Sequence, residues 1–147
     1  MPNSTATDIA EFLLAVNPQF LSTNHRSNHA VIAVGVEPEV QNKVIVTLYD
    51  TGGPPSNPAY QRDEPRIQVR VKGSSEFNYN SAYNMQQKIK DILLGMDRVV
   101  IGGTLYVGVW QQTDIANLAS DYNNRPILVA NYRTVRQYDT PNRLPIE

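Results

Sequence analysis

Two histidines, His25 and His29, have the spacing that first suggests metal chemistry. On a helix, imidazoles four residues apart can share one ion. The residues around and between them are Asn, Arg and Ser, which favour a loop, and no carboxylate is placed to orient either ring. We therefore expect two solvated loop histidines, no metal site and no cofactor.

Glycine pairs and adjacent carboxylates are the other groups that could bind an anion or share a proton. Gly52-Gly53 and Gly102-Gly103 each follow a strand-like run, and we favour a turn over a phosphate cradle at both. Asp63 and Glu64 point in different directions in an extended segment and form no dyad. The motifs GxxxxGK[ST], GxGxxG, GxSxG and HExxH are absent, as is cysteine. We expect no catalytic residues and a protein that is not an enzyme; the alternative, a site made by distant residues, predicts a deep pocket with shifted pKa values.

The clearest surface signal is a strand at residues 66–72, in which apolar and polar residues alternate. Its odd-numbered residues are apolar and predict a core face, and its even-numbered residues are polar or cationic. Tyrosine, with eight copies against one Trp and three Phe, is favoured where an apolar body meets a polar partner. The polar face is either an interface or a solvated face whose charges pair with Asp50, Asp63 or Glu64. The candidate interface residues are Tyr49, Thr51, Arg66, Gln68, Arg70 and Lys72.

Apolar spacing and backbone breakers divide the chain into the elements that must position this face. Apolar stripes at helical spacing predict two helices, at residues 6–16 and 78–96, the first capped by Ser4, Thr5 or Thr7. Several glycines and prolines exclude a regular element at residues 51–65, and the polar stretch at residues 111–125 has no assignment. Short β-branched or alternating runs predict strands at residues 30–36, 43–49, 66–72, 99–101, 104–110 and 126–136.

The length and charge of the chain limit its class. With 147 residues it has the size of one domain and can bury a core without disulfides. The 13 Lys and Arg against 14 Asp and Glu leave a net charge of −1, which provides no field to attract nucleic acid, and no run is long enough to cross a membrane. We expect an α+β fold in which a mainly antiparallel mixed β-sheet carries two helices packed on one face. Residues 1–147 form a single domain, with loose termini at residues 1–5 and 138–147.

The order of these segments resembles a known family. The chain carries an N-terminal DIAEFLLAV helix, then VTLYDTGGPPSNP, DEPRIQVRVKG, SAYNMQQKIKDILLGM and VVIGGTLYVGV, of which LYDTGG, EPRIQVRVKG and IGGTLY are the most specific. It is similar in these motifs to the tail terminator proteins of tailed bacteriophages, often described as minor capsid or tail-to-head joining proteins. The resemblance covers residues 7–110. The segment 22–41 inside this range and the segment 111–125 after it match no motif.

The resemblance implies a structural virion protein with a mixed sheet flanked by helices. Members of this family form a ring, commonly a hexamer, at the head-proximal end of the tail tube, where it stops tube polymerisation and joins the tail to the neck or connector. The implied partners are further copies of the chain, the tail tube protein and a neck or head-completion protein, with no membrane and with DNA only passing through the lumen. The implied location is the virion, after assembly in the host cytoplasm, which the absence of cysteine suits. The alternative is another head–neck completion protein, a connector or minor capsid protein that binds the portal or adaptor.

Overall fold

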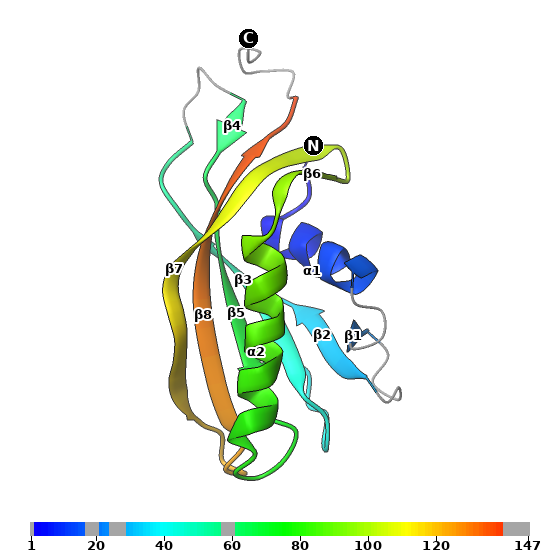
Figure 1. Ribbon diagram of the computed structural model, residues 1–147, viewed down its shortest axis with the longest axis vertical. Helices are drawn as coiled ribbons and strands as arrows, with labels where there is room; N and C mark the ends of the chain where they lie inside the picture. Colours follow the sequence, from blue (N-terminus) through cyan, green and yellow to red (C-terminus); the bar gives the residue numbers. More distant parts are fainter. Residues whose placement is uncertain (1, 17–20, 24–28, 57–60, 140–147) are drawn as a thin grey trace.

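The computed structural model describes residues 2–16, 21–23, 29–56 and 61–139 (Figure 1). The expectations for His25 and for a loose tail at residues 140–147 lie outside this range. Two helices and eight strands occupy the described chain: α1 Thr5–Val16, β1 Leu21–Ser22, β2 Ala30–Val34, β3 Ile45–Gly52, β4 Arg62–Asp63, β5 Arg66–Lys72, α2 Tyr79–Leu94, β6 Asp97–Ile101, β7 Thr104–Ser120 and β8 Pro126–Gln137.

The strands form one sheet in the order β1-β2-β3-β5-β8-β7-β6, and β4 pairs with β8 off this path. Strands β1, β2 and β3 run parallel to their neighbours in this group. The pairs β3–β5, β5–β8, β4–β8, β7–β8 and β6–β7 are antiparallel. The sheet twists partly around the helices (Figure 1), and two helices with one sheet agree with the α+β class indicated by the sequence.

Both helices begin at the kind of cap that the sequence offers. Ser4 Oγ accepts a hydrogen bond of 3.1 Å from the Thr7 N–H, and Asn78 accepts one of 3.2 Å from the Ser81 N–H. These side chains satisfy backbone donors that have no partner within the helix. Each helix then buries its apolar stripe in one core with the sheet, which includes Ile9, Leu13, Leu48, Ile67, Val69, Val71, Met85, Ile89, Leu93, Leu128 and Tyr132.

Buried polar contacts fix the helices on the sheet. The Tyr106 hydroxyl of β7 donates to Asp8 Oδ2 of α1 at 2.5 Å, and the Ala6 N–H is bound by Asp50 of β3 at 3.0 Å. Gln86 of α2 donates to the carbonyl oxygens of Val69 and Leu128 at 2.9 and 3.0 Å. Because a buried polar group without a partner costs free energy, these bonds specify where each helix sits.

Two stretches that the sequence leaves without regular structure contain strands. Residues 51–65 include the end of β3, which continues through Gly52, and the two-residue strand β4. Strand β4 pairs with Arg136 and Gln137 of β8. The prediction that this stretch has no regular element was therefore wrong at both of its ends. Strand β7 continues through the polar stretch to Ser120 because β8 pairs along its whole length. Strand β6 pairs with β7 only as far as Gly108. From Val109 onward β7 is therefore the edge of the described sheet, and its residues need no apolar outer face.

Candidate interface surface

The polar residues of β5 lie on the face of the sheet opposite the core that the helices share. Ile67, Val69 and Val71 are fully buried in that core, and since side chains alternate along a strand, Arg66, Gln68, Arg70 and Lys72 point the other way. Arg133 of β8 pairs directly with Arg66, and Trp110 of β7 pairs with Arg133. We call Tyr49, Arg66, Gln68, Arg70, Trp110 and Arg133 the arginine face.

Two of its arginines are held against aromatic rings. The guanidinium carbon of Arg70 lies 5.3 Å from the centre of the Tyr49 ring, and that of Arg133 lies 4.9 Å from the centre of the Trp110 ring. Arg70 also donates to Gln68 Oε1 at 3.5 Å, a long hydrogen bond. Cation–π contacts orient a guanidinium without neutralising its charge.

The charges of this face have no acidic partner in the described chain. Arg66, Arg70 and Arg133 form no ion pair with any described carboxylate, and the Nε atoms of Arg66 and Arg70 are buried without a hydrogen bond. Arg66 and Arg133 are also a directly opposed pair of like charges, an arrangement that destabilises a sheet. An anionic partner would offset the repulsion between Arg66 and Arg133.

The structure divides the residues nominated from the sequence. Arg70 contacts both Tyr49 and Gln68, and Arg66 lies on the same face of β5 as Gln68 and Arg70. Thr51 is exposed at a bulge where β3 leaves its register with β5. The expected acidic partners were wrong for Lys72, which binds Glu37 and Asp121, while Asp50 caps α1 and Asp63 approaches Arg136.

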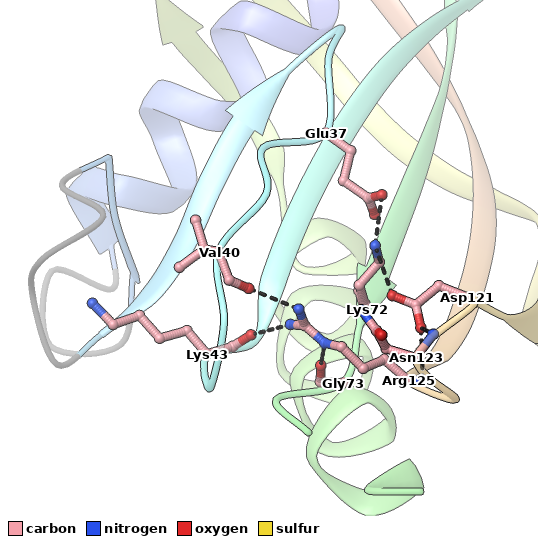
Figure 2. Close-up of polar contacts among 8 residues, drawn as sticks. All are labelled: Glu37, Val40, Lys43, Lys72, Gly73, Asp121, Asn123 and Arg125. Atoms are coloured by element: carbon pink, nitrogen blue, oxygen red, sulfur yellow. Dashed lines mark hydrogen bonds and ion pairs between the residues drawn. The ribbon is translucent and has the colours of Figure 1, made fainter. Parts of the chain in front are cut away.

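Lys72 instead belongs to a fully partnered cluster at the end of β5 (Figure 2). Its Nζ lies 3.0 Å from Glu37 Oε2 and 3.2 Å from Asp121 Oδ2, and only 12% of its side chain is exposed. Burial raises the pKa of the Asp121 carboxyl, but hydrogen bonds from the Arg125 N–H, from Lys72 and from the Asn123 N–H outweigh it, so the pKa lies below its ordinary value. The cluster therefore prefers ionised Asp121.

Arg125 completes the cluster, and the sequence did not reveal it. Its Nε donates to Gly73 O at 2.8 Å, and its Nη1 and Nη2 donate to Val40 O and Lys43 O, both at 2.7 Å (Figure 2). Arg125 thus connects three loops through backbone carbonyls. Because every residue has a backbone carbonyl, no side-chain pattern in the sequence identifies these partners. We call these loops, residues 35–44, 73–78 and 121–125, the loop end; it lies opposite the turn between β6 and β7 along the molecule (Figure 1).

Two hollows lie among the described residues, and neither has the form of an active site. A hollow of ≈ 530 Å³ at the loop end and one of ≈ 280 Å³ near Gln137 are both open, and neither is lined by the groups with shifted pKa values. Burial raises the pKa of Tyr106 and of Tyr132 to about 12, but both rings are in the core. Among the described residues, no three His, Asp or Glu side chains group closely enough to hold a metal ion. No helix in the described ranges is long and apolar enough to cross a membrane.

Comparison with known proteins gives the family. The model of the bacteriophage tail terminator proteins matches residues 16–138, which include all eight strands, α2 and the whole arginine face. No curated protein matches the chain. The match extends past the motifs to β8 and takes in the segments at residues 22–41 and 111–125. With more than half of its length matched, the chain belongs to the bacteriophage tail terminator family.

Proposed function

We propose that this structural tail protein forms a ring at the head-proximal end of the phage tail tube, stops tube polymerisation and joins the tail to the neck. The family match supports a structural role in the virion tail. The commonly six-fold ring implied by the motifs, the tube protein and the neck or connector protein as partners, and assembly in the host cytoplasm are parts of this proposal.

The observation that carries the proposal at the level of residues is the arginine face. Three guanidinium groups belong to half-buried side chains without a described acidic partner, and two of them lie over aromatic rings. Arginine, tyrosine and tryptophan are the residues most enriched at the energetic centres of protein interfaces. We assign this face to contact between subunits, with Tyr49, Gln68 and Arg70 at its centre and Thr51 at its margin. Lys72 lies at one end of the same strand face, is bound within the chain and does not bind the partner.

A ring also constrains the kind of contact. Cyclic symmetry above two-fold requires a heterologous interface, in which one patch of a subunit meets a different patch of the next. A cationic patch suits this role, because like charges on two copies of it would repel and would oppose a two-fold dimer.

The DNA that passes through such a ring should not be held by it. The net charge of −1 gives the chain no overall attraction for the phosphate backbone. We expect purified protein to leave duplex DNA unretarded in a gel at moderate salt. Strong retardation under these conditions would contradict a passive lumen.

The decisive experiment measures mass by light scattering, and tube length by electron microscopy, with and without the polymerising tail tube protein. A discrete ring, or capped tubes of limited length in the mixture, is the expected result. A persistent monomer that leaves tube length unchanged would favour the alternative, a head–neck completion protein that binds the portal or adaptor.

A further inference from the structure

The loop end exposes aromatic side chains on a rigid support. Phe77 is 76% exposed and Tyr122 is 86% exposed, more than any other aromatic side chain of the described residues. Phe77 also has a φ of 59°, in the left-handed region that bulky residues seldom adopt. Backbone strain of this kind is retained mainly at functional sites, and aromatic residues are the kind on which interfaces are centred.

The support is rigid because each loop is bound to another. The Phe77 N–H donates to Asn124 O at 2.9 Å, and Arg125 and Lys72 join these loops to residues 37–43. A surface held in one conformation loses little entropy when it binds. The loop end is therefore organised for docking before a partner arrives.

The charged side chains of the loop end that are exposed are acidic. Glu39 and Glu76 are exposed, and neither has an ion pair in the described chain. Of the cations of the same loops, Arg125 is 8% exposed and bound to carbonyls, and Lys43 is half-buried. Beside Glu76 and Tyr122, the hollow of ≈ 530 Å³ is lined by the amide side chains of Gln41, Asn42, Asn123 and Asn124. Carboxylate and amide oxygens are what an entering guanidinium group requires.

We infer that the loop end of one copy docks on the arginine face of the next copy. Glu76 then binds the guanidinium groups of Arg66 and Arg70, and Phe77 or Tyr122 packs beside Tyr49. The occupant is a second copy because the two surfaces of this one chain complement each other in charge and in aromatic content. This inference rests on the proposed ring and names its two patches.

Disulfide trapping tests the contact, because the chain has no cysteine of its own. One variant carries Gln68→Cys on the arginine face and a second carries Ser75→Cys at the loop end. A mixture of the two should give a cross-linked dimer, each variant alone should give none, and a chain with both changes should give a ladder of oligomers. Glu11→Cys on exposed α1, mixed with either variant, is the control and should remain uncross-linked.

Charge reversal shows whether the named residues make the contact. Adding Glu76→Arg to the Ser75→Cys chain should lower the yield of cross-linked dimer about tenfold or more. Adding Arg66→Glu to the Gln68→Cys partner of that variant should restore part of the yield. Cross-linking between two copies of the Gln68→Cys variant would overturn the head-to-tail contact. A yield of cross-linked dimer that Glu76→Arg leaves unchanged would overturn it too.

The same samples distinguish this inference from the proposed function. They are mixed with the tail tube protein, and tube length is measured alongside cross-linking. Capped tubes without cross-linking between the two positions overturn the inference and leave the terminator role intact. Cross-linked ladders with unlimited tube growth support the contact and overturn the role.

Discussion

Lys72 and Arg66 lie at opposite ends of strand β5 and on the same face, but the surroundings of their charges differ. Lys72 binds two carboxylates, and the neighbouring Arg125 binds three backbone carbonyls. Arg66 faces another arginine and has no described acidic partner. A charge that is satisfied within the chain stabilises the fold, whereas one left unsatisfied is available for assembly. One face of one strand thus serves both purposes, and substitutions should separate them.

The largest effect on stability is expected at Arg125. Arg125→Ala leaves three loop carbonyls without their donor and should lower the free energy of unfolding by about 2–4 kcal/mol. Urea denaturation at neutral pH measures this loss. Arg70→Ala, a half-buried arginine of the arginine face, is the matched control and should cost less than about 1 kcal/mol. Equal losses of unfolding free energy for the two variants would mean that the loop end and the arginine face contribute alike to stability.

A smaller loss is expected at Lys72. Lys72→Met keeps the aliphatic stem but leaves Glu37 and Asp121 close together without their cation, which should cost about 1–3 kcal/mol. Arg66→Met provides a control on the same strand and face, and it should be close to neutral. If Arg66→Met costs as much as Lys72→Met, Arg66 has a stabilising partner in the free subunit.

The pH dependence of stability should show the same cluster. Because the pKa of Asp121 is depressed in the folded chain, its contribution is present above the ordinary aspartate pKa of about 3.9 and disappears as the pH falls through the folded value. Wild type should therefore be more stable than Asp121→Asn at pH 7, and the two should converge in acid. Denaturation curves measured from neutral to acidic pH test this, and a difference that persists unchanged in acid would assign it to packing.

The smallest effect on stability is expected at Arg66. Arg66→Gln removes one of two opposed like charges and should change the free energy of unfolding by no more than about 0.5 kcal/mol, in the stabilising direction. The same variant should lose most of its self-association by light scattering. Intact association would exclude Arg66 from the contact.

The elements with a strong local pattern could be predicted from the sequence. Strict alternation gave β5 its observed bounds at Arg66 and Lys72, and the apolar stripe placed α2 within two residues at each end. The extension of β7 could not be predicted, because residues 111–120 lie on a polar sheet edge and four register shifts interrupt β7. An edge strand paired on one side has no need of alternation.

Only part of the candidate site could be predicted from the sequence, for a related reason. The alternation of β5 located Arg66, Gln68 and Arg70, but it could not distinguish them from Lys72. What distinguishes them is Glu37 and Asp121, which the fold brings from two other loops. Arg133 and Trp110 were missed because each lies on a different strand and only the register between β5, β8 and β7 joins them.

The three hydrogen bonds of Arg125 also affect the order in which the chain folds. They span 82, 85 and 52 residues along the sequence, and contacts of such separation form late because a long loop must first close. Arg125 directly precedes β8, so the loop end locks only when the last strand has joined the sheet. An unfinished chain would lack the docking surface and would not be incorporated into a growing ring. Assembly would then admit only completely folded subunits, without the help of any separate factor.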